Sequence, residues 1–367
     1  GRLDDEAWKD AAAYEDFFFQ HEPLDRAPSS EKTRVMVLQD KDTIYFGIQA
    51  YDSEPEKLFA SAMRQDKDIW SDDVVELLID TFRDFRNCYA FVTNPLGVKG
   101  DAIISDQGGD INKSWDCIWR VKSTVNERGW ATEMAFPFKS LKYGKGDTVE
   151  WGLNITRNIR HRRETTYLVP IPRGLGHDGK FKGGLYAVLA NIHPPAPGVN
   201  LEVQPYARAG KTWVYRPDGS DSESDAGMDV RYHVTPQFTV DATFNTDFAQ
   251  VESEEEVVNV TRFNIYLPEK RDFFLENAGL FNFSMTSSAG EYYDEDADFI
   301  LFNSRTIGIH GGKRTPLYGG AKVAGRVGKY SIGAMNIQSE RTPLGNGRDA
   351  PSTNYSAFRV KRDILSN

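Results

Sequence analysis

Polar and apolar residues alternate along two neighbouring stretches in the second half of the chain. Apolar side chains occupy every second position between residues 226 and 234, and residues 237–247 repeat the pattern. A period of two is typical of a β-strand with one apolar and one polar face. Only Thr235 and Pro236 separate the two stretches, and so short a connection predicts an antiparallel hairpin.

Strands of the same kind are expected throughout the second half. Their predicted ranges are 199–208, 226–234, 237–247, 259–267, 299–308, 317–327, 330–339 and 355–362. Short turns at 235–236 and 328–329 contrast with long polar loops at 217–225 and 340–353. Outer-membrane β-barrels alternate short periplasmic turns with long outer loops. We therefore interpret this half as barrel strands, with a second sandwich as the alternative.

The first half predicts an antiparallel β-sandwich with few helices. Ten short strands are expected at 34–39, 43–51, 74–80, 88–93, 98–105, 115–125, 130–136, 149–158, 165–169 and 184–189. Pro, Gly, Asn and Asp punctuate nearly all the gaps, and short strands at this spacing fit a sandwich. Only residues 55–65 have clear helical composition, so the fold class predicted for the chain is all-β.

A chain of 367 residues is too long for one average domain and predicts two. A proline-rich hinge at 193–198 separates a sandwich at 1–192 from the N-terminal part of a barrel at 199–367. The chain reaches Asn367 without a terminal aromatic strand, so the barrel is expected to be incomplete in this chain.

The net charge of −10 argues against nucleic acid or anionic lipid as the main partner, because phosphate binding needs a surplus of Lys and Arg. We interpret the one basic cluster, at 160–163, as a strand end or turn. No apolar run is long enough for a transmembrane helix, which does not exclude barrel strands. Cys88 and Cys117 are expected to be buried thiols, since strands about 10 Å apart are too distant for a disulfide.

Four segments of the first half resemble carbohydrate-binding module family 9, in that family's order and spacing. They are GRLDDEAW at 1–8, DTIYFGIQAYD at 42–52, DDVVELLIDT at 72–81 and GWATEMAFPFKSL at 129–141. The resemblance implies a jelly-roll-like sandwich that clamps a sugar between two tryptophans and carries structural calcium.

Three aromatic residues are the candidate carbohydrate ligands: Trp70, Trp115 and Tyr167. Trp70 lies between acidic residues before a strand, where its ring could stack on a sugar while neighbouring carboxylates accept hydroxyls. The alternative is that Trp70 plugs the end of the sandwich. Relatives often carry a second tryptophan near Tyr167, where this chain has Leu168, and this departure argues against a two-sided clamp.

Carboxylates crowd the stretch around Trp70, at Asp66, Asp68, Asp72 and Asp73. Calcium prefers six to eight oxygen ligands, and acidic loops supply them. The stretch is therefore a candidate structural calcium site, with a solvated acidic loop as the alternative. Elsewhere no spacing of residues indicates a hydrolase.

The segment FNTDFAQVESEEEVVNVTRFNIYLPEKRDFFLEN at 244–277, with NSRTIGIHGG at 303–312, resembles an outer-membrane family of unknown function. Members of that family place a family-9-like module before a barrel. Residues 268–298 interrupt the barrel pattern as a long, aromatic-rich insertion. The insertion could fold into the lumen or against the front domain, or it could be an ordinary packed excursion.

Together these features predict a non-enzymatic outer-membrane protein of a Gram-negative bacterium, with a saccharide or similar polyol as ligand. Outer-membrane lipid and proteins of a larger complex are the other expected partners. A structural docking or plug module, and the accessory module of a secreted glycoside-degrading enzyme, are the alternatives. If the long loop at 217–225 lies outside, the first barrel strand enters from the periplasm, where the module at 1–192 is then expected.

Overall fold

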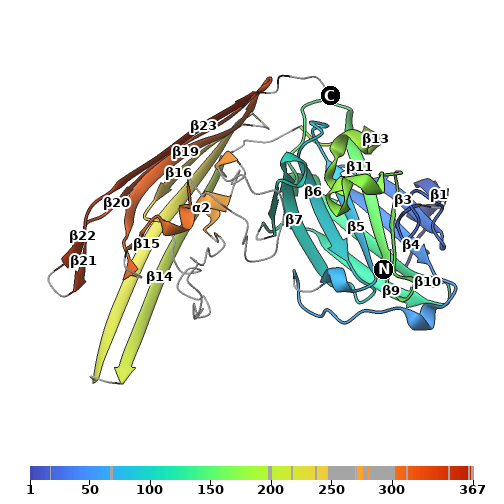
Figure 1. Ribbon diagram of the computed structural model, residues 1–367, viewed down its shortest axis with the longest axis horizontal. Coiled ribbons are helices and arrows are strands. Elements are labelled where there is room, and N and C mark those ends of the chain that lie inside the picture. Colours follow the sequence, from blue (N-terminus) through green and yellow to red (C-terminus); the bar gives the residue numbers. More distant parts are fainter. Residues whose placement is uncertain are drawn as a thin grey trace. The chain divides into compact units, whose positions relative to one another are not determined.

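The chain folds into two compact units of antiparallel β-structure, Gly1–Pro197 and Gly198–Asn367 (Figure 1). The all-β class predicted for the chain is confirmed. The computed structural model describes residues 1–16, 18–66, 69–113, 115–196, 201–215, 218–235, 238–246, 269, 271–275, 280–281, 302–310, 313–345, 348–362 and 364.

Two antiparallel sheets pack face to face in the first unit and form the predicted sandwich. The first sheet has the order β1 (Ala12–Asp16), β3 (Thr33–Gln39), β4 (Thr43–Tyr51), β10 (Gly129–Pro137) and β9 (Arg120–Asn126). The second has the order β2 (Phe19–Glu22), β12 (Glu164–Tyr167), β11 (Val149–Ile159), β5 (Val74–Asp80), β6 (Cys88–Thr93), β7 (Lys99–Ser105) and β8 (Asp110–Asn112), while β13 (Ala187–Ile192) also pairs with β11. Buried side chains from both sheets, among them Phe46, Phe91, Phe136 and Ile155, form one core.

The strands that the sequence did not predict in this unit are β1, β2 and β8. In β1 every residue is exposed, so the strand has no alternation of polar and apolar positions to reveal it. Cys88 and Cys117 are free and buried, as expected. Burial raises the pKa of each thiol to about 12.

Short 3-10 helices connect the strands: η1 (Glu6–Asp10), η2 (Pro55–Lys57), η3 (Ile69–Ser71), η4 (Asp106–Gly108), η5 (Phe138–Ser140), η6 (Arg160–Arg162), η7 (Arg173–Leu175), η8 (His177–Phe181) and η9 (Gly183–Leu185). The helix expected at 55–65 is wrong, because only η2 forms there. Ser61 and Ala62 donate their backbone N–H groups to the carboxylate of Asp72 instead of to helical carbonyls. Within the described part of the chain, no helix has the length and apolar character needed to cross a membrane.

One six-stranded antiparallel sheet dominates the second unit. Its order is β14 (Leu201–Tyr215), β15 (Asp218–Thr235), β16 (Phe238–Phe244), β19 (Leu317–Val327), β20 (Tyr330–Ser339) and β23 (Asn354–Arg362). Two small hairpins, β17 (Ile309–His310) with β18 (Lys313–Arg314) and β21 (Thr342–Gly345) with β22 (Arg348–Ala350), accompany it. The described helices are α2 (Asp272–Leu275) and η11 (Ser304–Thr306).

The loop expected at 217–225 is wrong, because those residues from Asp218 onward belong to β15. They pair with the end of β14, from Arg208 opposite Asp225 to Tyr215 opposite Asp218. The partner strand satisfies the backbone groups of a Ser- and Asp-rich segment whose own strand propensity is low. The β14–β15 hairpin therefore extends beyond β16, as Figure 1 shows.

Two other expectations for this unit need correction. The loop at 340–353 contains the β21–β22 hairpin. Residues 302–308 of the strand expected at 299–308 contain η11, because the Arg271 guanidinium binds the carbonyls of Ser304 and Ile307. The strand expected at 259–267 lies outside the described residues, as does most of the insertion at 268–298.

Candidate functional sites

The segment that precedes β5, a central strand of the second sheet, is the candidate ligand surface of the first unit, because the outer face of β5 itself is buried. On β5 the side chains of Val75, Leu77 and Ile79 point into the core, so Glu76 between them points to the outer face. Trp70, in η3, leads directly into this strand. The strand order thus places the predicted aromatic residue beside the outer face of a central strand.

Trp70 is half-buried and packs on a small apolar cluster that includes Ala62, Val74 and Val92. The Lys113 ammonium lies 4.7 Å from the centre of its ring, a distance at which a cation is attracted to an aromatic face. A sugar that stacks on that face has to displace Lys113. Trp70 therefore remains a candidate sugar-binding residue, with one face of its ring covered by the Lys113 side chain.

The other two predicted aromatic residues have different surroundings. Trp115 stacks on Tyr89, with ring centroids 5.1 Å apart, and packs against the main core. Tyr167 is only 1% exposed, with its ring 5.1 Å from that of His21. A ring so deeply buried offers no face to a sugar in this conformation. The structure therefore does not bring the three rings into one aromatic platform.

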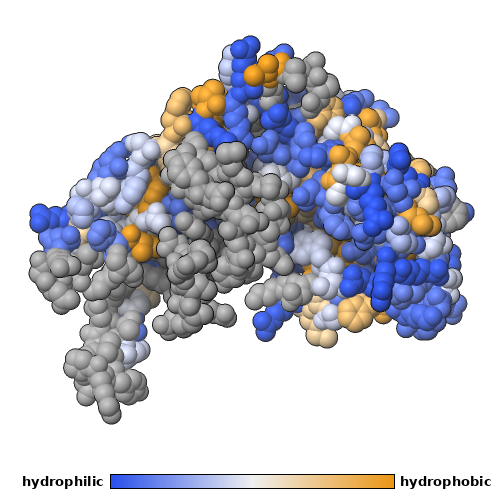
Figure 2. Space-filling view, viewed as in Figure 1, coloured by the Kyte–Doolittle hydropathy of each residue, from blue (hydrophilic) through white to orange (hydrophobic). Residues whose placement is uncertain are grey.

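The sequence analysis missed a buried ion pair at the centre of this face. Glu76, 3% exposed, accepts hydrogen bonds from Lys180 Nζ at 2.7 Å and Thr156 Oγ1 at 3.0 Å. The sequence signal for this ion pair is a glutamate, Glu76, in the middle of the apolar run VVELLID. Figure 2 shows mostly hydrophilic side chains over the visible surface of the first unit, with scattered apolar patches.

The carboxylates of the candidate calcium set are used by the protein itself. Asp72 accepts hydrogen bonds from the backbone of Ser61 and Ala62 and from the Asn94 amide. Burial of Asp72 opposes ionisation, but these donors hold the pKa of its carboxyl below the usual value. Its carboxylate oxygens therefore cap the preceding loop and do not form an open cation site.

Asp73 and Asp66 are occupied in a similar way. Asp73 accepts the N–H groups of Phe59 and Arg160, and Asp66 accepts that of Asp101 at 3.1 Å. Among the described residues, no group of three or more His, Cys, Asp or Glu side chains could hold a metal ion. Asp68 lies outside the described residues. The candidate calcium site, which includes Asp68, stays a prediction.

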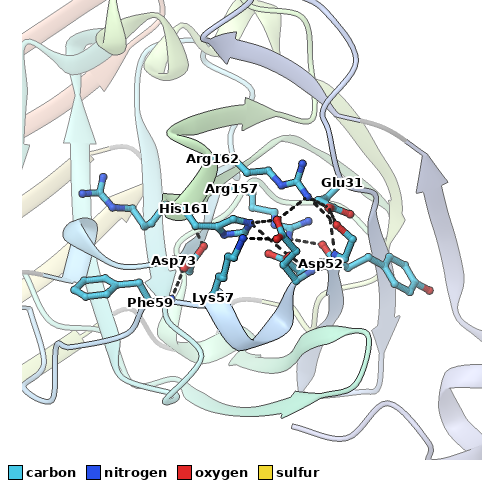
Figure 3. Close-up of polar contacts among 12 residues, drawn as sticks. Glu31, Asp52, Lys57, Phe59, Asp73, Arg157, His161 and Arg162 are labelled. Carbon is cyan, nitrogen blue, oxygen red and sulfur yellow. Dashed lines mark hydrogen bonds and ion pairs between the residues drawn. The ribbon is translucent and has the colours of Figure 1, made fainter.

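The basic cluster at 160–163 is a turn, η6, at the end of β11, as predicted. Figure 3 shows one of its arginines, Arg162, directed into a network of acidic side chains. Arg162 donates to Glu31 at 2.7 Å. His161 Nε2 lies 3.7 Å from an Asp52 oxygen and 3.8 Å from a Glu54 oxygen, farther than a hydrogen bond.

Arg157 at the centre of this network ties the two sheets together. It is 1% exposed and donates to the carbonyls of Lys32 and Tyr51 and to the hydroxyl of Thr33. Burial lowers its pKa to about 10, against the attraction of the surrounding carboxylates. The two terminal nitrogens of Arg157 are used in these internal contacts, whereas its Nε and both ring nitrogens of His161 are buried without a hydrogen-bond partner among the described residues.

The sheet of the second unit has a polar side that is covered and an apolar side that is exposed. The covered face holds Asp241, 3% exposed, and Lys322, 1% exposed. The outward face holds large exposed apolar residues, including Leu201 at 52%, Phe244 at 55% and Phe358 at 68%. This distribution is the reverse of the usual one for a protein in water.

A row of alternating charges crosses four neighbouring strands on the covered face. Glu202, Arg231, Asp241 and Lys322 are direct cross-strand partners on β14, β15, β16 and β19. Arg231 lies 3.4 Å from Glu202 and 2.8 Å from Asp241, and Lys322 lies 3.4 Å from Asp241. This charge row went unnoticed in the sequence, because alternation marks a polar face without showing that the face is buried.

Residues of the insertion cover the apolar continuation of this face. Phe273, Phe274 and Phe281, together with Ile307, pack against sheet residues that include Leu317, Met335 and Ile337. Gly333 leaves the space for Phe281, because a Cβ atom there would lie 3.1 Å from the phenyl ring. The insertion, where described, is therefore a packed element of the second unit.

Comparison with known proteins separates the two halves of the chain. Residues 1–166 match the family described as "Carbohydrate family 9 binding domain-like", and residues 197–344 match a "Domain of unknown function (DUF5916)". Residues 1–166 are therefore similar to this family, as the resemblance predicted. The outer-membrane assignment of the second half stays a prediction.

Two solved structures are similar to this chain. A protein assigned as carbohydrate-binding from Bacteroides uniformis ATCC 8492 is 13% identical, with a TM-score of 0.39 over 48% of this chain and 85% of that one. A family 9 carbohydrate-binding module from Caldicellulosiruptor kristjanssonii, in complex with cellotriose, is 14% identical, with a TM-score of 0.35 over 53% of this chain and 88% of that one. No curated protein matches the chain.

Proposed function

We propose that the chain is a non-enzymatic outer-membrane protein whose first unit binds a saccharide or a similar polyol. The match of residues 1–166 to the family-9-like binding domain carries the carbohydrate part of the proposal. The surface around Trp70, just before β5, is the proposed binding place. There an aromatic ring and the Lys113 ammonium supply a stacking face and a hydrogen-bond donor.

Weak binding is expected, because the platform has one side. Trp115 and Tyr167 are committed to packing, so no second ring completes a clamp around the sugar. Displacement of Lys113 from the Trp70 ring also subtracts from the affinity. Dissociation constants in the millimolar range, worth about 4 kcal/mol of binding free energy, are therefore expected.

A glycan array followed by calorimetric titration tests this part of the proposal. Trp70→Ala should abolish sugar binding by the full chain. The matched control is Phe85→Ala, since Phe85 is another surface ring with a cation, Arg83, over its face at 5.8 Å. Absence of binding in the millimolar range, or equal loss in both variants, contradicts the proposed site.

The membrane part of the proposal rests on the outward face of the second unit. In the described sheet, the outward positions from Leu201 to Ala207, from Ala226 to Val234 and along β16 carry no charged residue. The nine residues from 226 to 234 are separated by eight steps, which span about 26 Å at the usual rise of about 3.3 Å per residue. That length is close to the apolar band of about 25 Å around outer-membrane barrels. An uncharged band of this height fits against the acyl chains of a lipid bilayer.

The direction of the strands supports a periplasmic position for the first unit. β14 begins at the end of the sheet that carries the short connections at 236–237 and between Val327 and Tyr330. The projecting β14–β15 hairpin lies at the other end, where outer loops are long in membrane barrels. The chain therefore enters the sheet from the proposed periplasmic side.

Fractionation and labelling test the location. The full-length protein should be recovered with outer membranes and migrate differently after heating in detergent. A membrane-impermeant thiol reagent on intact cells should label a cysteine at Ser224, which is exposed on β15, and spare one at Ser30. Soluble recovery contradicts membrane insertion, whereas the reverse labelling places the first unit on the cell surface.

One observation favours a second candidate function, a structural module that docks on another protein. Tyr167 is buried and Leu168 packs against the core, so the region expected to hold the second platform is closed. This docking function is favoured if the protein is recovered with outer membranes but binds no sugar in the glycan array and the calorimetric titration.

A further inference from the structure

The charge row of the second unit needs an explanation if the outward face contacts lipid. Side chains of four charged residue types in one cross-strand row cannot face acyl chains, because charged groups are costly at membrane depth. They lie on the covered face, with Glu202 56% exposed at one end of the row and Lys322 buried at the other. In a lipid-embedded sheet this face lines the interior.

The described part of the insertion closes the buried end of the charge row. Lys322 Nζ donates to the backbone carbonyl of Phe273, and its ammonium lies 5.0 Å from the centre of the Phe273 ring. Phe273, 2% exposed, also borders a crevice between Glu202, Arg231 and Asp241 that has room for about one water molecule. One aromatic residue thus fills the space beside the charges.

Arg271 holds this aromatic segment in place. It is 2% exposed, forms an ion pair of 2.7 Å with Glu269, and donates to the carbonyls of Ile307 and Ser304 at 2.8 and 2.7 Å. The guanidinium also lies 4.2 Å from the centre of the Phe274 ring. The segment therefore has polar anchors to the sheet and to the 302–307 stretch, besides its apolar contacts.

We propose that the second unit is a closed conduit for small hydrophilic solutes, in which residues 271–275 are the stopper on the charge row. The inference rests on the proposed membrane insertion. The row carries two negative and two positive side chains, and Asp229 also lines the crevice, so charges of both signs border the space. Such a mixed lining suits uncharged polar solutes such as small sugars, which use both donors and acceptors. Removal of the stopper opens a polar surface next to water.

Liposome swelling with the full-length protein tests this proposal, with glucose and the larger raffinose as probes. Wild type should give no swelling. Phe273→Ala, which removes the filling ring, should allow glucose to enter faster than raffinose. Phe358→Ala is the matched control, because Phe358 is an exposed phenylalanine on the outward face of β23. It should leave the liposomes tight.

A second variant covers the case in which Phe273→Ala does not fold. Lys322→Met keeps the length of the side chain and removes the bond to the Phe273 carbonyl, so it should also permit swelling. Wild type that swells like an open porin, or variants that insert, show heat-modifiable migration and stay tight, overturn the stopper. Protein that fails to insert at all contradicts the membrane proposal and this one with it.

Discussion

The two units are built from the same antiparallel strands but distribute polar and apolar residues in opposite ways. The first unit has an apolar core between its two sheets, with Phe91, Trp151 and Ile155 among its members, and its buried charged residues lie outside that core. The second unit buries Asp241 and Lys322 on one face of a sheet and exposes apolar residues on the other. Alternation with a period of two is common to both units.

The difference shows that alternation identifies two faces without identifying their solvents. In water, apolar burial is favourable at roughly 25 cal/mol per Å², so the apolar face of a sheet is its inner face. In lipid this driving force between protein surfaces is absent, and polar groups need partners inside the protein. The charged side chains of the row in the second unit have such partners in one another. The large apolar side chains of the outward face have no polar groups that need a partner.

The largest losses of stability should come from substitutions of buried residues, an apolar one in the first unit and a charged one in the second. Phe91→Ala leaves a cavity in the sandwich core and should lower the free energy of unfolding by about 3–5 kcal/mol. Asp241→Ala should have a similar cost, about 3–5 kcal/mol, for a different reason, because it leaves Lys322 and Arg231 without their shared carboxylate. Denaturant titration of each variant measures both.

A double variant distinguishes the two mechanisms. Lys322→Met added to Asp241→Ala removes the uncompensated charge, so part of the lost stability should return. No second substitution of this kind is expected to rescue Phe91→Ala, since a cavity stays empty. If the double variant is no more stable than Asp241→Ala, the buried charges are not what stabilises this face.

A matched pair of valines tests the two surfaces. Val203 on β14 and Val188 on β13 are each 50% exposed. Val203→Arg should cost about 2–4 kcal/mol in a bilayer, the usual penalty for a cation near the middle of the lipid face of a barrel. Val188→Arg should stay within about 0.5 kcal/mol, as surface substitutions in water do. Equal costs would mean that both surfaces face water.

Much of the fold could be predicted because strand periodicity is local. The sequence placed β3 to β7 and the sheet strands β16, β19 and β20 close to their observed ranges. It failed where the stabilising partner is distant in sequence. Residues 218–225 look like a loop until Arg208–Tyr215 pairs with them, and β1 is a strand only because β3 lies beside it.

The candidate sites were harder to predict, because burial of individual side chains is not local. The sequence identified Trp70 and the acidic stretch, but it could not show that Tyr167 is buried or that Asp72 is capped by Ser61 and Ala62. Nor could spacing reveal that Arg231 and Asp241 share one row with Lys322. That row depends on the register of strands separated by a long insertion.

Buried carboxylates give the first unit a smaller, pH-dependent contribution. Burial, with Asp66 and Asp116 nearby, raises the pKa of Asp101 to about 6, against the hydrogen bond from Trp119 Nε1. Because the folded state then holds this proton more tightly than the unfolded state, stability should rise as pH falls from about 6 towards 3.8.

Thermal unfolding of wild type and Asp101→Asn across that range isolates the effect. The variant has no carboxyl group at this position to protonate. The free energy of unfolding of wild type should therefore rise relative to that of the variant as the pH falls, by at most about 1.4 kcal/mol for each pH unit. Other carboxylates contribute equally to both proteins and cancel in the difference. A constant difference between pH 4 and about 7 would show that Asp101 titrates alike in both states.

The smallest expected effect concerns the Trp70 ring, the proposed stacking face of the first unit. Lys113 covers the Trp70 ring at 4.7 Å, and a surface cation–π contact is worth about 0.5–1 kcal/mol. Lys113→Ala removes this competitor, so a sugar that stacks on the same face should bind a few-fold more tightly by calorimetry. Arg83→Ala, which uncovers Phe85 in the same way, is the control and should leave affinity unchanged. Weaker binding after Lys113→Ala would make the lysine itself a sugar ligand, whereas unchanged binding would place the sugar on another surface of the sandwich.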